Sequence, residues 1–142
     1  MWTSPVGIDL VAWLLATARR AYRGAEPTVD WVRVTAAAPW QARDSQGEVV
    51  HDNKLWIFGG WFNSHEAPPR DVWNSAERQT WNRVKKTAPW IHGDLSMLLT
   101  FRNKMWFMGG WYNGRLPGHS ASSHVWSSTD GVHWTQVTDS EA

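Results

Sequence analysis

The side chains of this chain that could bind a metal or transfer a proton are its histidines and a few carboxylates. The 142-residue sequence has six histidines and no cysteine. They show no His-x-x-x-His or His-x-Glu spacing of the kind that holds zinc; they are His51, His65, His92, His119, His124 and His133. We therefore expect no metal and no other cofactor, and we expect histidines that are scattered over the surface.

Four aspartates could act as paired acids, since glycoside hydrolysis uses two carboxyl groups across one bond. Asp44 and Asp94 hold equivalent positions in a sequence repeat, whereas Asp71 and Asp130 lie at a strand start or in a turn. Aspartate is common at such positions, because its carboxylate accepts hydrogen bonds from nearby backbone N–H groups. We interpret all four as turn or capping groups. With no phosphate loop or nucleophile elbow either, we expect no catalytic residues and no enzyme.

Tryptophan is the most unusual feature of the composition, with 13 residues. All except Trp2 and Trp13 fall in five columns of a repeat, in which Trp31 recurs as Trp81 after 50 residues and as Trp134 after 53 more. A large aromatic residue that recurs in register is better explained by packing than by a unique site. The repeated residues that we expect to be structural are Trp31, Trp81, Trp134, Trp56, Trp106, Trp73, Trp126, Gly59, Gly60, Gly109 and Gly110.

Each repeat has the pattern of four short antiparallel strands. The apolar runs on either side of Asp52-Asn53 and of Arg102-Asn103 predict hairpins, because a tight turn between two such runs is a hairpin signal. The strands expected are 47–51, 54–58, 70–74 and 81–85 in the first repeat, and 96–101, 104–108, 124–127 and 134–138 in the second.

The glycine pair after the second strand, the Trp in the third strand and the Trp that begins the fourth resemble a kelch repeat. The resemblance covers residues 28–138 and is to propellers of the galactose-oxidase-like central-domain type. It implies an all-β propeller with two four-stranded blades, 47–85 and 95–138, and an orphan strand at 31–35. Copper-radical oxidases also use kelch-type propellers, but their Cys–Tyr crosslink cannot form in a chain without cysteine.

The two repeats differ in the turn before the last strand. The second repeat has Asp130-Gly131, and the first has Glu77-Arg78 at the same place. Glycine accepts a positive φ at little cost and arginine does not. We therefore expect the second blade to be the better ordered one.

Two blades are fewer than the four to eight with which propellers usually close, so two apolar sheet faces need partners. Either copies of the chain form a closed ring, or the chain is part of a longer propeller that supplies further blades. The orphan strand favours the longer propeller. In a ring of identical copies, residues 31–35 and 134–138 would compete for the same outer position of a blade.

Residues 1–27 lie outside the repeat and predict a short α-helix, with Ser4-Pro5 at its start and Ile8, Val11 and Leu15 near one face. A signal peptide is the alternative, because Ala16-Thr17-Ala18 resembles a cleavage site. It lacks a basic n-region, and Asp9 interrupts the apolar run, so a cytoplasmic location is slightly favoured over secretion. The stretch is too short to span a bilayer.

The loops that follow the glycine pairs are the predicted binding surface. They carry Trp61, Phe62 and Asn63 in the first repeat, and Trp111, Tyr112 and Asn113 in the second. Loops on a rigid scaffold often bind ligands, and aromatic residues beside Asn suit a sugar or a protein anchor. The alternative is that Trp61 and Trp111 pack between blades.

The charge balance excludes one class of partner. The chain has 14 Lys+Arg against 13 Asp+Glu, so we expect no nucleic-acid partner. We predict a non-catalytic protein- or glycan-binding segment. The alternatives are a fragment of a secreted carbohydrate-active propeller enzyme and a structural remnant without activity of its own.

Overall fold

The computed structural model describes residues 31–63, 65–112 and 120–138. The chain divides into two units, Met1–Arg33 and Val34–Ala142, and all the strands of the described residues belong to the second. The predicted N-terminal helix lies outside the described residues. The strands are β1 (Gly47–His51), β2 (Lys54–Phe58), β3 (Val72–Ser75), β4 (Asn82–Lys85), β5 (Met97–Phe101), β6 (Lys104–Met108), β7 (Val125–Ser128) and β8 (Thr135–Thr138).

These strands form two four-stranded antiparallel sheets of identical plan. The strand order is β1-β2-β3-β4 in the first sheet and β5-β6-β7-β8 in the second, so every strand pairs with its neighbour in sequence. No helix occurs in the described ranges of the chain. The prediction of an all-β fold with two four-stranded sheets is confirmed, and the strands lie close to the bounds expected from the sequence.

Two tight turns set the register of the sheets. In the β1–β2 hairpin, Asp52 and Asn53 have φ of 48° and 54°, and in the β5–β6 hairpin Arg102 and Asn103 have φ of 48° and 57°. Two successive residues with positive φ make the type I′ turn, whose twist matches that of the flanking strands. The predicted turns are therefore confirmed.

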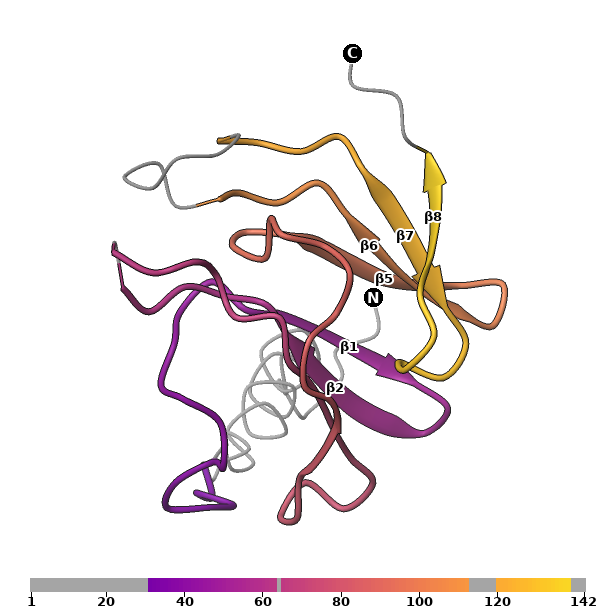
Figure 1. Ribbon diagram of the computed structural model, residues 1–142. Coiled ribbons are helices and arrows are strands. Elements are labelled where there is room, and N and C mark those ends of the chain that lie inside the picture. The colour runs from indigo at the N-terminus through magenta and orange to yellow at the C-terminus, as the bar shows by residue number, and fades with distance from the viewer. Residues whose placement is uncertain (1–30, 64, 113–119, 139–142) are drawn as a thin grey trace, which may run out of the picture. The chain divides into compact units, whose positions relative to one another are not determined.

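The two sheets pack face to face, and the core lies between them (Figure 1). Phe58 of β2 and Phe107 of β6 are fully buried, with ring centroids 6.0 Å apart. Trp90, from the segment between β4 and β5, stacks on Phe107 at 4.2 Å. Burial of one such side chain stabilises a fold by about 1.5–3 kcal/mol. The remaining core residues are Trp56, Val72, Ala88 and Met105.

Hydrogen bonds also join the first sheet to the second. The Thr100 hydroxyl donates to the carbonyl oxygen of Val50 at 2.6 Å, and the backbone N–H of Gly60 donates to the carbonyl oxygen of Gly93 at 2.7 Å. The two sheets are therefore joined by polar contacts near both ends of β1 and β2, as well as by the apolar core.

The orphan strand predicted at residues 31–35 is wrong, because these residues form no strand. A strand needs a neighbour for its backbone N–H and C=O groups. The last position of each sheet is already held by β4 or β8. Trp31 is 93% exposed, whereas Trp81 and Trp134 of the same column are half-buried.

Candidate functional site

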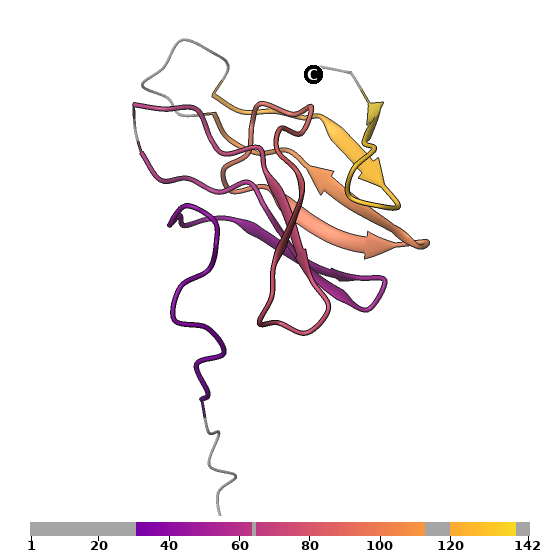
Figure 2. The same cartoon turned by 60° about the horizontal axis from the view of Figure 1, so that its bottom comes forward.

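Each glycine pair ends a strand and begins one of the candidate loops. Gly59 and Gly60 have φ of 67° and 97°, and Gly109 and Gly110 have φ of 67° and 108°. A Cβ atom on Gly59 would collide with the carbonyl oxygen of Gly93, so a larger residue does not fit there. In Figures 1 and 2 the two loops lie at the same end of the sheets, opposite the β1–β2 and β5–β6 hairpins.

The first residue of each loop is fixed through its backbone. Trp61 and Asp44 exchange two hydrogen bonds of 2.8 and 2.9 Å, and Trp111 and Asp94 exchange two of 2.7 and 3.2 Å. Trp111 also forms a bridge with Ala121. The repeated aspartates thus lie beside the repeated tryptophans, and both tryptophans have a firmly held main chain.

The side chains of the candidate loops differ in exposure. Trp111 is 40% exposed, and Trp61, Phe62 and Tyr112 are half-buried. The Tyr112 ring lies edge-on to His92, with centroids 6.0 Å apart. Asn113 lies outside the described residues. The structure therefore places Trp61, Phe62, Trp111 and Tyr112 on loops at the same end of the sheets, and none of the four residues is fully buried.

Asn63 shapes its own loop. Its side-chain oxygen accepts a hydrogen bond from the backbone N–H of His65 at 2.9 Å, and its amide nitrogen donates to Glu66 at 3.4 Å. An Asn that bonds to the backbone two residues later makes an Asx turn. The contacts of Asn63 hold the loop in shape around the aromatic residues.

A buried ion pair that no sequence pattern indicates supports the start of the first loop. Arg43 and Asp71 form two hydrogen bonds, of 2.6 and 3.1 Å, and Arg43 also donates to the carbonyl oxygen of Gly59 at 3.0 Å. Asp71 accepts a further bond from the indole N–H of Trp73 at 2.7 Å. Because Gly93 and His124 stand at the equivalent positions of the second repeat, the pair does not recur.

The surroundings of Asp71 and Asp94 shift their acidity in opposite directions. Burial raises the pKa of Asp71, but hydrogen bonds from Arg43 and Trp73 and the charge of Arg43 outweigh it and hold the pKa below its usual value. Burial and the nearby charge of Asp44 raise the pKa of Asp94. One oxygen of Asp94 is buried with no hydrogen-bond partner, a costly arrangement for a carboxylate.

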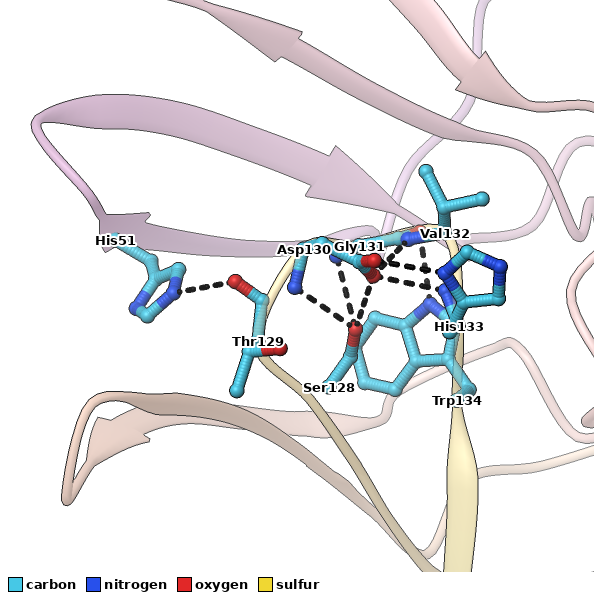
Figure 3. A network of polar contacts seen from close by, with 8 residues as sticks. All are labelled: His51, Ser128, Thr129, Asp130, Gly131, Val132, His133 and Trp134. Carbon is cyan, nitrogen blue, oxygen red and sulfur yellow. Dashed lines mark hydrogen bonds and ion pairs between the residues drawn. The ribbon is translucent and has the colours of Figure 1, made fainter.

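Asp130 organises the turn between β7 and β8 (Figure 3). One of its oxygens accepts hydrogen bonds from the backbone N–H groups of Val132 and His133 at 2.9 and 2.8 Å, and the other pairs with the His133 ring at 2.7 Å. Slight burial raises the pKa of Asp130, but these bonds lower it well below its usual range. The prediction that Asp130 is a turn group is confirmed.

The prediction of surface histidines is wrong for two residues. His51 and His92 are only 4% and 5% exposed. His51 ends β1 on the side that faces the second sheet, and its Nε2 lies 3.1 Å from the carbonyl oxygen of Thr129 (Figure 3). A buried polar ring is tolerated where such a partner exists. Among the described residues, no three His, Asp or Glu side chains gather as metal ligands.

Comparison with known proteins gives no match, either to a protein-family model or to a curated sequence. The described part of the chain contains no helix that is long and apolar enough to cross a membrane. The geometry of the loops is therefore the basis for a functional proposal.

Proposed function

We propose that this chain is a non-catalytic binding module built from two kelch-type propeller blades, and that it contacts its ligand through the loops after the glycine pairs. The observation that carries the proposal is Trp111. Its side chain is 40% exposed, although its backbone is hydrogen-bonded to Asp94 and bridged to Ala121. An exposed aromatic on a fixed backbone loses little entropy when a ligand stacks on it.

Three features support blades of kelch type. Both sheets follow the same meander of four strands, both have a type I′ hairpin between the first two strands, and both turn at a glycine pair with positive φ. This arrangement brings the two loops to the same end of the sheets (Figure 1). The loops begin with Trp61 and Phe62 in the first repeat and with Trp111 and Tyr112 in the second.

The ligand class that we propose first is a glycan. The faces of Trp and Tyr rings present flat apolar surface with a polar edge, which suits the mixed character of a sugar ring. A protein ligand that is anchored by the same aromatic residues is the other outcome of the experiment.

The experiment is a glycan array probed with the purified chain, together with a pull-down from cell extract. We expect Trp111→Ala and Tyr112→Ala to weaken ligand binding at least tenfold, about 1.4 kcal/mol for each residue. Trp31→Ala is the matched control, because Trp31 is an exposed tryptophan outside the loops, and it should bind like the wild type. Near-ultraviolet circular dichroism verifies the fold of each variant.

A folded protein that retains no glycan and no protein would refute the proposal. So would a Trp111→Ala variant that binds as tightly as the wild type.

A further inference from the structure

The interface between the two sheets uses one face of each, here called the inner faces. In the hairpin registers, the inner face of the first sheet carries alternate residues of β1 and β2, namely Gly47, Val49, His51, Lys54, Trp56 and Phe58. The inner face of the second sheet carries Leu98, Thr100, Met105 and Phe107. These two faces fit each other within one chain.

The outer faces carry the intervening residues of the same strands. On the second sheet these are Met97, Leu99, Phe101, Lys104, Trp106 and Met108, and on the first they are Glu48, Val50, Leu55 and Ile57. The repeat spacing of 50 residues makes the outer face of the second sheet equivalent to the inner face of the first. Likewise, the outer face of the first sheet is equivalent to the inner face of the second. Each outer face is therefore the repeat equivalent of one of the two inner faces, and the two inner faces already pack together inside the molecule.

Both outer faces are mainly apolar and exposed, and each carries one charged residue of its hairpin, Glu48 on the first sheet and Lys104 on the second. Met97 is 69%, Phe101 54% and Val50 61% exposed. On the first sheet, the outer face has a pocket of about 440 Å³ lined mainly by Val50, Leu55, Ile57 and Trp81. Exposed apolar surface of this kind commonly marks a contact with another protein surface.

The sizes of the side chains are complementary across the two outer faces. The second sheet has Met97, Leu99 and Phe101 where the inner face of the first has Gly47, Val49 and His51. The first sheet has Ile57 where the inner face of the second has Phe107. The outer face of the second sheet is thus the bulkier one, and the pocket on the first sheet offers the additional room.

A pair of tryptophans repeats the internal contact on the outer face of the first sheet. Trp40 and Trp81 lie edge to face with centroids 4.7 Å apart, and Trp90 and Trp134 lie edge to face at 4.8 Å. Inside the molecule Trp134 also packs on Phe58 at 5.4 Å. Met108 stands at the position equivalent to Phe58, so it would pack on Trp81 of another copy.

We propose that a second copy of this chain covers these faces, with the outer face of the second sheet packed on the outer face of the first sheet of the next copy. This is a head-to-tail interface, which closes into a ring when the rotation permits. The competition expected from an orphan strand does not arise, because residues 31–35 form no strand. The proposal is independent of the ligand-binding loops.

Arg78 modifies the repeated contact. Inside the molecule Gly131 lies against the ring of Trp56, and in the proposed interface Arg78 takes the place of Gly131 and Trp106 that of Trp56. The Cβ atom of Arg78 would hold the loop farther from the indole. We therefore expect Arg78→Gly to tighten the association.

The test is light scattering on the full chain over a range of concentrations, with two single-face variants. Phe101→Glu places a charge on the outer face of the second sheet, and Val50→Glu places one on the outer face of the first. Both side chains are more than half exposed, so the substitutions leave the fold intact, as circular dichroism will verify. We expect the wild type to exceed the chain mass of 16.2 kDa and each variant alone to have that mass.

An equimolar mixture of the two variants is the decisive sample. Each variant keeps the face that the other has lost, so the mixture should form one-to-one dimers and nothing larger. Arg78→Gly should shift the association of the unmodified faces to lower concentration. A wild type that stays monomeric would overturn the proposal. A single variant that still self-associates, or a mixture that forms no dimer, would overturn it as well.

Discussion

Gly131 lies against the six-membered ring of Trp56, so closely that a Cβ atom at position 131 would overlap the indole. Gly131 belongs to the turn between β7 and β8, and Trp56 belongs to β2 of the first sheet. The indole N–H of Trp56 donates to the carbonyl oxygen of His51 at 2.9 Å, which fixes the ring in place. A turn of the second sheet therefore completes the core of the first.

Gly131→Ala should lower the free energy of unfolding by about 2–5 kcal/mol. The backbone conformation, with φ of 73°, costs a non-glycine residue about 1–2 kcal/mol, and the overlap with Trp56 adds about 1–3 kcal/mol. Urea denaturation followed by tryptophan fluorescence measures the change. In a Trp56→Phe background the same substitution should cost less, because the smaller ring leaves mainly the backbone term. Equal costs in both backgrounds would show that the ring contact contributes nothing.

Arg78→Gly should raise the free energy of unfolding by about 0.5–1 kcal/mol. Arg78 has φ of 70°, a conformation that costs arginine about 1–2 kcal/mol, and glycine removes this strain. Glycine also raises the conformational entropy of the unfolded chain, which offsets part of the stabilisation. The backbone N–H at position 78 keeps its bond to the Ser75 hydroxyl, at 2.7 Å. Thermal unfolding at low protein concentration measures the effect. Glu77→Gly is the control and should destabilise, because Glu77 is not among the residues with positive φ. A loss of stability in Arg78→Gly would contradict the assignment of strain.

Arg43→Met should cost about 2–4 kcal/mol of stability, because it leaves the largely buried Asp71 carboxylate without its cationic partner. The Arg43 and Asp71 side chains are only 2% and 16% exposed. Lys54→Met is the matched control. It breaks the exposed pair between Lys54 and Asp52, whose side chains are 38% and 74% exposed, and should change stability by less than about 1 kcal/mol. If urea denaturation gave the same loss of unfolding free energy for both variants, the burial of the Arg43–Asp71 pair would add nothing to its contribution to stability.

Asp94→Asn should stabilise the protein at pH 7 and have little effect near pH 3. The pKa of Asp94 is raised in the folded state. Its contribution to the stability of the fold is therefore most favourable below its pKa in the unfolded chain, about 3.9, and is lost as pH rises through its pKa in the folded protein. Asparagine removes that loss. Melting temperatures of wild type and variant at pH 3, 5 and 7 should diverge as pH rises. A constant difference across this range would rule out the shift.

The effect of pH on the stability contribution of Asp71 is opposite to that of Asp94. Its pKa is lowered in the folded state, so its stabilisation is present above the unfolded value of about 3.9 and is lost as pH falls through the folded pKa. Asp71→Asn should therefore destabilise at pH 7 and lose its effect in strong acid. A comparison of this variant with Asp94→Asn separates the two carboxyl groups in one pH series.

The strands were predictable because their signals are local and occur twice. Apolar runs around Asp52-Asn53, and the glycine pair Gly59-Gly60 that ends the second run, define strand ends without reference to distant residues. The strand expected at residues 31–35 failed for the opposite reason, since a strand exists only where a neighbour can pair with it. The burial of His51 likewise depends on Thr129, which lies far along the chain.

The candidate site was predictable only in its placement. The repeat identified Trp61 and Trp111 as loop residues and aligned Asp44 with Asp94, but it did not indicate that each aspartate lies beside a tryptophan. Arg43 and Asp71 are 28 residues apart and have no counterparts in the second repeat. Side-chain pairs of this kind depend on how the chain folds back on itself, and a local or repeated sequence pattern does not predict them.

The contact between Trp56 and Gly131 has a consequence for the synthesis of the protein. Gly131 follows Trp56 by 75 residues, so the first sheet emerges from the ribosome long before the turn that covers its indole. At about 5–20 residues per second, this leaves Trp56 without its native cover for about 4–15 s on every nascent chain. Apolar strands that remain uncovered for this long can bind chaperones or associate wrongly, so the first sheet is open to misassembly during translation.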